Sequence, residues 1–281
     1  MRPDVPGRPS GRGEPSEPED RLRVRRALAT AAEGLAPDHV PPALCRAGVA
    51  LLPVTGASVS ISAGATVRAT WCASDPTAAR LAEAQYTLGD GPGQSALRQA
   101  AAMLAADLTT PPDAGRWPVF AHEAVALGVR AVFSLPLGVD GATAIGTLDL
   151  YRHSPGALSE RELRIASWTG DAVTFALTNL HTGARAAEEA GHEGTASWLA
   201  ASEAHHGEVY QAVGMVMVQS GLAPEQALDR MRARAFAQGR TVTEVAREVL
   251  ARRLRFTSGP AADSEDAGRR DACDDEREDN R

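Results

Sequence analysis

The chain has 281 residues and a formal net charge of −7, with 29 basic and 36 acidic residues. All of the basic residues are arginine, and the lack of lysine excludes the usual forms of P-loop proteins, protein kinases, receiver domains and Schiff-base enzymes, because each needs a lysine. The length provides room for one medium-sized and one small domain.

The three cysteines, Cys45, Cys72 and Cys273, lie far apart in the sequence. Since there is neither a CxxC pair nor a histidine at zinc-ligand spacing, we expect no metal site and no disulfide framework. The N-terminal segment lacks an apolar signal core, and no apolar stretch reaches membrane-spanning length. These features predict a cytoplasmic protein with no membrane contact.

Both ends of the chain are expected to be disordered tails. Residues 1–20 and 258–281 combine proline, glycine, serine and charge with almost no apolar residues, so they cannot bury enough surface to offset the entropy of ordering. Between the tails we place an N-terminal domain at 21–185 and a small C-terminal module at 203–257.

The N-terminal domain begins with a helix and a hairpin. Apolar residues recur at helix spacing over 44–51, and residues 57–62 and 66–71 then alternate at period two across a short turn. Asp75 and Pro76 supply an N-cap and a first-turn proline, which together predict that a helix begins there.

The rest of this domain continues the alternation of helices and strands. The glycine-rich segment 88–100 leads into a helix. We then expect a strand at 103–108, a helix near 118–128, and strands at 131–137 and 144–151 that flank a turn at Asp140 and Gly141. Hairpins with interspersed helices predict an antiparallel α+β fold.

A long linker helix is predicted over 159–187. Ser159 and Glu162 form a capping box at its start. Packing on the domain's own sheet explains the apolar positions up to Leu177 as well as a dimer seam does, but no sheet remains to cover those beyond it. We therefore expect a homodimer, on positions at coiled-coil spacing: Leu163, Ala166, Gly170, Val173, Leu177, Leu180, Ala184 and Ala187.

The C-terminal module is predicted to contain three helices. The first ends at Gly221, a natural left-handed position after a helix. The second begins at Pro224 and ends at Gly239. The third begins with a capping box of Thr241 and Glu244.

The sequence EVYQAVGMVMVQSGLAPEQALDRMRARAFAQGRTVTEVAREVLARRLRF (208–256) resembles the ANTAR family of RNA-binding antitermination modules. It departs from the family at Val213, where lysine is frequent, and at Met231, where leucine is usual. Because small residues let helix backbones approach closely, we interpret the matching positions mainly as packing sites: Ala212, Gly214, Ala227, Ala235 and Ala246.

RNA contacts are then expected from arginines. Arg230 and Arg234 share a helix face, while Arg252 and Arg253 crowd a helix end, where guanidinium groups can pair with phosphates or stack on unpaired bases. Without the resemblance, such a helix would more often be a solvated face. The resemblance implies RNA stem-loops as partners, and the candidate RNA-binding residues are Arg230, Arg234, Arg240, Arg247, Arg252 and Arg253.

Four segments in order resemble a GAF domain, a small-molecule sensor fold related to PAS, of the type joined to ANTAR modules in actinobacteria: GASVSI (56–61), WCASDPTAARLAEAQYTLGDGP (71–92), RWPVFAHEAVALGVRAVFSLPL (116–137) and LDLYRHSPGALSEREL (148–163). The resemblance implies an antiparallel sheet with flanking helices. The loop of Gly89, Gly91 and Gly93 either lines a ligand pocket together with apolar residues of the central strands or is a loop of tight turns that binds no ligand.

The ligand and any cofactor stay unidentified at this point. The cyclic-nucleotide motif of this fold requires lysine, and no Cys-His pair suggests a site for a linear tetrapyrrole. His122 or His153 would serve as a haem ligand only if it pointed into the pocket.

These features predict a non-enzymatic, signal-responsive regulator of transcription antitermination. A DNA-binding regulator is one alternative, although the module's 8 arginines against 6 acids, a net of +2, argue against strong duplex binding. A thiol-dependent methionine sulfoxide reductase is another. It would need two cysteines close together near the pocket, which their separation in the sequence argues against.

Overall fold

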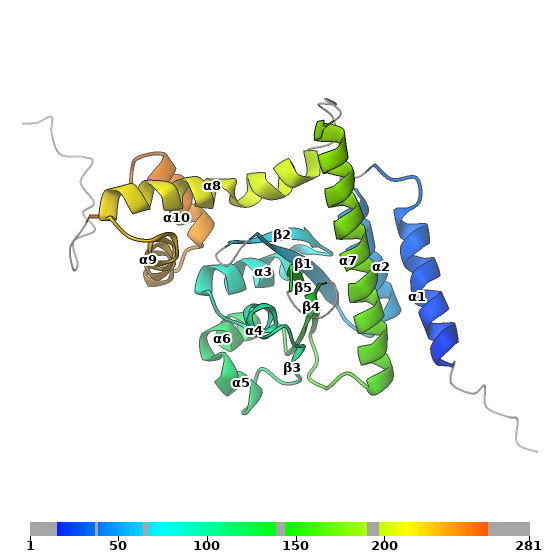
Figure 1. Ribbon diagram of the computed structural model, residues 1–281. Helices are drawn as coiled ribbons and strands as arrows, with labels where there is room; N and C mark the ends of the chain where they lie inside the picture. Colours follow the sequence, from blue (N-terminus) through cyan, green and yellow to red (C-terminus); the bar gives the residue numbers. More distant parts are fainter. Residues whose placement is uncertain (1–15, 37–38, 64–66, 139–143, 190–196, 258–281) are drawn as a thin grey trace, which may run out of the picture.

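A five-stranded antiparallel sheet lies at the centre of the N-terminal domain (Figure 1). This computed structural model describes residues 16–36, 39–63, 67–138, 144–189 and 197–257. All neighbouring strands pair antiparallel, which confirms the predicted α+β fold class. In the spatial order β2-β1-β5-β4-β3, the strands are Val67–Ala73, Gly56–Ala63, Gly146–Arg152, Ala131–Leu137 and Met103–Ala105.

Helices cover both faces of the sheet. The first layer packs apolar side chains against Val59, Phe133 and Leu148, and it consists of α1 (Glu17–Ala32), α2 (Val40–Leu51) and α7 (Glu160–Glu189). The second layer has its own apolar core around Trp117 and Phe120, towards β3 and β4. It consists of α3 (Pro76–Leu88), α4 (Pro92–Gln99), α5 (Asp113–Arg116) and α6 (Pro118–Ala126).

The strand register gives the two faces different chemistry. Val59 on β1 lies opposite Leu148 on β5, and both side chains belong to the core under α1, α2 and α7. Successive strand residues point to opposite faces, so Ser58 and its partner Asp149 point towards α3 and α4. The sheet therefore has one apolar face and one face with buried polar residues.

Capping residues begin the helices where the sequence predicted. The Asp75 carboxylate accepts hydrogen bonds from the backbone N–H groups of Thr77 and Ala78, which fixes the start of α3. The Ser159 and Glu162 capping box begins α7. Strand β3 ends earlier than expected, at Ala105, and the Asp113 carboxylate accepts from the next two backbone N–H groups.

Helix α1 was not predicted, and it begins at Glu17, inside the segment expected to be a tail. Its apolar residues Val24 and Leu28 are buried in the core under α7, and this burial offsets the ordering entropy. Residues 1–15, the Asp140 and Gly141 turn and the predicted tail 258–281 lie outside the described residues.

The expectation of no disulfide was wrong. Cys45 on α2 and Cys72 on β2 form a disulfide, with their Cα atoms 6.8 Å apart, although 27 positions separate them in the sequence. Helix α2 lies on the sheet face to which Cys72 points, so the fold brings the two residues together. Within the described residues, no cluster of histidine, cysteine and acidic side chains could hold a metal ion.

The first part of the proposed dimer seam on α7 packs within the chain. Ala166, Val173 and Leu177 are buried in the core with α1 and α2. Leu180, Ala184 and Ala187 lie on α7, but their side chains are outside the described part of the chain. None of the helices described here is long and apolar enough to cross a membrane.

The C-terminal module contains the three predicted helices, and Thr241 and Glu244 form the capping box that begins the last one. Their apolar residues share one core, which includes Val216 and Met231. Tyr86 of α3 is packed into this core, so the module contacts the N-terminal domain. The helices are α8 (Ser197–Ser220), α9 (Pro224–Ala237) and α10 (Val242–Leu250).

Candidate functional site

Buried polar side chains gather on the sheet face that α3 and α4 cover. In the register, Ser58 on β1 and Ser134 on β4 flank Asp149 on the strand between them. Ser60 on β1 lies opposite Thr147 on β5 in the next row. We define the polar cluster as these strand residues together with one residue of α3; all are buried: Ser58, Ser60, Ser134, Thr147, Asp149 and Gln85.

Gln85 connects the strands of the polar cluster to the helices above. Its side-chain amide donates to Oδ2 of Asp149 at 3.3 Å, and its Oε1 accepts from the backbone N–H of Gly93 at 2.6 Å. The Thr147 hydroxyl donates to the same Asp149 oxygen. In the described part of the chain, the buried Ser134 hydroxyl has no hydrogen-bond partner. An unpaired buried hydroxyl costs free energy, so Ser134 retains unused hydrogen-bonding capacity.

The three predicted glycines lie at the ends of α3 and α4. Gly89 ends α3 with a φ of +65°, and Gly91 precedes α4 with a φ of +130°. A Cβ at Gly91 would lie 2.8 Å from the Gln85 side chain, so the close approach of the loop to Gln85 requires glycine there. The glycine loop thus lies over the polar cluster, where the strand residues are polar rather than apolar as expected.

The two histidines considered as haem ligands are both exposed. Nδ1 of His153 lies 3.0 Å from the carbonyl oxygen of Gly128. His122 lies on α6, whose buried side consists of Phe120, Ala121 and Ala124. Neither side chain points into the polar cluster.

Three predicted RNA-binding arginines lie around one carboxylate of the C-terminal module. Arg240 and Glu248 form an ion pair of 3.0 Å. The hydrogen bond from Arg240 holds the pKa of Glu248 below its ordinary value, and the nearby charges of Arg253 and Arg234 act in the same direction. We call Arg234, Arg240 and Arg253 the arginine surface. The Glu244 carboxylate also acts on Arg240, so three arginines face Glu244 and Glu248, which leaves an excess of one positive charge.

The other three predicted arginines have different surroundings. The Arg230 guanidinium lies 5.9 Å from the ring centroid of Phe256. Arg247 forms an ion pair of 2.8 Å with Glu208 of α8. Arg252 is exposed just after α10, next to Arg253.

Arg232 belongs to the same arginine-rich helix but is not one of the six candidate RNA-binding residues, and it faces the N-terminal domain. Its Nε donates to the backbone carbonyl of Tyr86 at 3.0 Å, and its guanidinium lies 5.6 Å from the centroid of the Tyr86 ring. Tyr86 is only 3% exposed, and this burial raises the pKa of its hydroxyl. Arg232 therefore holds α9 against the C-terminal end of α3.

Helix α10 makes two further hydrogen bonds to α3. The backbone N–H of Val242 donates to the Thr87 hydroxyl at 3.1 Å, and the Thr243 hydroxyl donates to Glu83 at 2.9 Å. We call this contact of α3 with α9 and α10 the docking contact. Gln85 of the polar cluster lies on the same helix turn as these residues.

Two known domain families match the chain. Residues 37–178 match the GAF domain, and residues 199–250 match the ANTAR domain. The chain belongs to the GAF family and carries a C-terminal ANTAR domain. Both resemblances seen in the sequence are thereby confirmed, and the two domains support a role in signal transduction and transcription regulation. No curated protein matches the chain.

The small residues of the ANTAR signature do not all have the same role. The four alanines are fully buried in the core of the ANTAR domain, as expected for packing sites. Gly214 is not a packing site: it is exposed, and a Cβ there would have no neighbour within 4 Å. It lies two residues after the buried Ala212, which turns it towards solvent on α8.

Solved structures from several organisms are similar to the chain. The GAF domain of a phosphoenolpyruvate-protein phosphotransferase from Coxiella burnetii is 12% identical with a TM-score of 0.46; the match covers 60% of this chain and 98% of that structure. A free methionine-R-sulfoxide reductase from Thermoplasma acidophilum is 13% identical, with a TM-score of 0.38 and coverage of 56% and 94%.

Sequence reasoning missed the polar cluster and the docking contact. The polar cluster left a signal, because ASVSIS and TLDL place serine, threonine or aspartate at alternate strand positions, which share one face. The docking contact left none, since Thr87 and Val242 are 155 positions apart in the sequence.

Proposed function

We propose that this GAF-ANTAR protein is a cytoplasmic, signal-responsive regulator of transcription antitermination that binds RNA stem-loops through its ANTAR domain. The observation that supports this most is the arginine surface, on which residues from α9 and from both ends of α10 come together around Glu248. Guanidinium groups can pair with phosphates and stack on unpaired bases, which a hairpin loop exposes.

Loop recognition is favoured over duplex DNA for a physical reason. Phosphate neutralisation drives sequence-independent duplex binding, and the module has a net charge of only +2, from 8 arginines and 6 acids. Two of the candidate arginines, Arg240 and Arg247, are already paired with carboxylates. A few arginines suffice for a loop, where stacking on bases adds to the phosphate contacts.

The GAF domain is proposed to control RNA binding through a small polar ligand at the polar cluster. Gln85 contacts Asp149 and Gly93 on one side of α3, while Tyr86 and Thr87 hold the ANTAR domain on the other. A ligand that bonds to Asp149 would compete with Gln85 for the carboxylate and thereby shift α3. The ligand would thus shift the equilibrium between a docked and a released ANTAR domain.

A homodimer is proposed through the part of α7 beyond Leu177, which extends past the sheet (Figure 1). Two ANTAR domains in one dimer would hold two stem-loops, and the effective concentration of the second domain would raise the affinity for paired stem-loops. Release of the docking contact would allow both domains to bind at once.

The test of RNA binding uses a double variant, Arg252→Ala with Arg253→Ala, in the full chain. Both side chains are exposed, so folding should be unaffected. If each arginine neutralises a phosphate, the affinity for a two-stem-loop RNA should fall and the slope of affinity against salt should decrease by about 1–2 units. The matched control is Arg25→Ala with Arg26→Ala, two exposed arginines on α1 of the GAF domain.

Two results would contradict the proposal. One is that the double variant binds the RNA as tightly as the parent at matched salt. The other is that the parent protein binds duplex DNA better than the RNA, which would support a DNA-binding regulator instead.

The disulfide removes one argument against a methionine sulfoxide reductase, because Cys45 and Cys72 do lie together. However, both side chains belong to the apolar core under α2, on the opposite face of the sheet from Asp149. A ligand at the polar cluster would not reach the thiols, so we propose that the protein is not an enzyme. Turnover of free methionine sulfoxide by the reduced protein would contradict this.

A further inference from the structure

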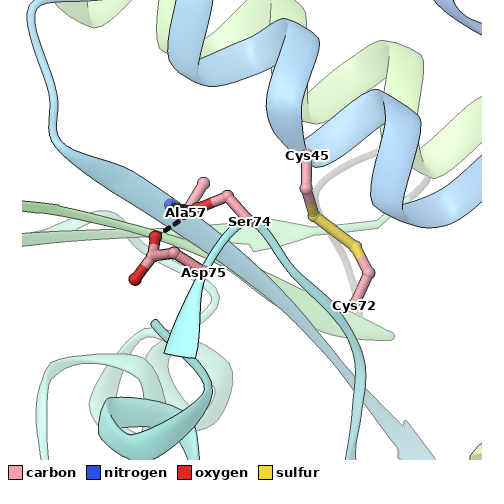
Figure 2. Close-up of a disulfide and its surroundings, with 5 residues drawn as sticks. All are labelled: Cys45, Ala57, Cys72, Ser74 and Asp75. Carbon is pink, nitrogen blue, oxygen red and sulfur yellow. Dashed lines mark hydrogen bonds between the residues drawn. A yellow bond between two sulfur atoms is a disulfide. The ribbon is translucent and has the colours of Figure 1, made fainter. Parts of the chain in front are cut away.

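The disulfide between Cys45 and Cys72 lies at a structural junction (Figure 2). Cys72 is near the end of β2, which forms an edge of the described sheet and pairs there with β1. The register of this pairing shifts between Val59 and Ser60, directly beside the pair of Val59 with Cys72. The pairing of β2 with β1 is therefore irregular next to Cys72. The disulfide attaches β2 to α2 at this position.

The chain passes directly from Cys72 into α3. Two residues later, the Ser74 hydroxyl accepts from the backbone N–H of Ala57 at 2.8 Å and donates to the Asp75 carboxylate at 2.6 Å (Figure 2). Asp75 caps α3 and also accepts from the Tyr151 hydroxyl at 2.8 Å. The position of α3 relative to the sheet therefore depends on the few residues that follow Cys72.

The C-terminal module rests on both elements that Cys72 joins. Helix α8 packs along β2, and the last turn of α3 makes the docking contact with α9 and α10. A change in the position of β2 should consequently alter both the packing of α8 on β2 and the docking contact on α3.

We propose that Cys45 and Cys72 form a reversible regulatory disulfide, whose oxidation strengthens the docking of the ANTAR domain on the GAF domain. This inference rests on the proposed function in one respect: a protein that meets transcripts works in the cytoplasm, where persistent disulfides are rare and those that form are usually catalytic or redox-sensing. In a regulator that is not an enzyme, the redox-sensing role applies. The docking of the ANTAR domain would then respond both to the redox state of Cys45 and Cys72 and to the ligand at the polar cluster.

The chemistry is thiol–disulfide exchange with a small dithiol or its disulfide. In reduction, a thiolate of the dithiol attacks one sulfur of the protein disulfide and forms a mixed disulfide, releasing the other cysteine as a thiolate. The second thiol of the dithiol then breaks the mixed disulfide. The protein gains two electrons and two protons in total, and the dithiol becomes a cyclic disulfide.

Attack at Cys72 is favoured, because it lies on the edge strand and is 6% exposed, against 1% for Cys45. At such burial the exchange requires local opening of β2. Oxidation runs the same steps in reverse, with the cyclic disulfide as the oxidant.

The experiment equilibrates the full chain with reduced or oxidised dithiothreitol under native conditions. Alkylation and mass spectrometry should find Cys45 and Cys72 modified after reduction and protected after oxidation. Amide hydrogen exchange should then be roughly tenfold faster in segments 76–88 and 242–250 of the reduced protein, because a cross-link that restricts local opening has been removed.

Variants separate the disulfide from general effects of the reagent. The Cys45→Ala and Cys72→Ala double variant should exchange like the reduced parent in both buffers, and Cys273→Ala should keep the full response. If the double variant does not fold, the comparison of reduced and oxidised parent still decides the question.

The inference is overturned if the disulfide resists reduction until the protein unfolds, or if the reduced and oxidised proteins exchange identically at α3 and α10. Since the readout needs no RNA, the two proposals fail separately. A redox response without RNA binding contradicts only the proposed function, and RNA binding without a redox response contradicts only this inference.

Discussion

The two faces of the central sheet are both buried, yet they are built from opposite kinds of residue. On β4, Phe133 and Leu135 point into the apolar core under α1, α2 and α7, whereas Ser134 between them points to the polar cluster. All three side chains are at most 6% exposed. Burial alone therefore does not distinguish a residue that stabilises the fold from one that is available for binding.

The two kinds of buried residue differ in their contribution to the free energy of folding. Burying apolar surface contributes about 25 cal/mol per Å² to stability, whereas burying a polar group without a partner costs free energy. A fold selected only for stability would have apolar residues on both faces. The ligand site proposed above would explain why this face is polar.

Helix α8 repeats this contrast in the ANTAR domain. Ala212 is fully buried against α9 and α10, while Gly214 is exposed and has open space around it. An exposed glycine within a helix is costly by about 1 kcal/mol relative to alanine and contributes no packing. Gly214, like Ser134, is thus a residue that folding does not explain.

The largest effect is expected from Phe133→Ala, on the apolar face. Phe133 is fully buried, so its truncation should lower the free energy of unfolding by about 3–5 kcal/mol, through lost burial and the cavity left behind. Urea unfolding followed by circular dichroism measures this. Val119→Ala on α6 is the control, because Val119 is 42% exposed and should cost within about 0.5 kcal/mol. A cost below about 1 kcal/mol for Phe133→Ala would break the contrast between the faces.

The second largest effect is expected from loss of the charged contact between α1 and α7. Arg161 of α7 donates two hydrogen bonds to the Asp20 carboxylate of α1, at 2.6 and 2.7 Å. These bonds hold the pKa of Asp20 below its ordinary value of 3.8. A lowered folded-state pKa means that the contact stabilises the protein above the ordinary value and is lost as the pH falls through the folded-state value.

Asp20→Asn should therefore be less stable than the parent at neutral pH, with the difference shrinking as the solution becomes acidic. Chemical unfolding of both proteins over a series of pH values measures it. A difference that stays constant with pH would mean that the Asp20 contact with Arg161 does not help to hold α1 on α7.

Much of the fold was predictable because local signals mark where elements begin. Asp75 with Pro76, Ser159 with Glu162, and Thr241 with Glu244 each placed a helix start within a residue of its position in the structure. Alternation in strands predicted the antiparallel pairs. These signals act over a few residues, so a single sequence contains them.

Contacts between distant parts of the chain were not predictable in the same way. Cys45 and Cys72 are 27 positions apart in the sequence, and the packing of α2 on the sheet brings them together. Gln85 reaches Asp149 across 64 positions, and its role depends on how α3 sits over the sheet. Such contacts follow from packing, which one sequence does not specify locally.

The third effect is expected from Gly214→Ala, which should raise the free energy of unfolding by about 1 kcal/mol, because alanine is the better helix former and has room there. Thermal unfolding of the full chain measures it. Gly221→Ala is the matched control: it has open space too, but its φ of +69° strains any other residue, so it should destabilise. A loss of RNA affinity in Gly214→Ala, despite the gain in stability, would place this glycine at the RNA interface.

The smallest effect is expected from Ser134→Ala, beside Phe133 on the same strand. The Ser134 hydroxyl is fully buried and has no hydrogen-bond partner within the described residues. Its removal leaves no donor or acceptor unpaired, so the free energy of unfolding should stay within about 1 kcal/mol of the parent or rise slightly. The same urea unfolding experiment as for Phe133→Ala measures both neighbours under one condition. A cost for Ser134→Ala close to that of Phe133→Ala would mean that the hydroxyl is bonded in the folded protein and that the polar face is structural. A near-zero cost would instead leave ligand binding as the reason for a serine at this position.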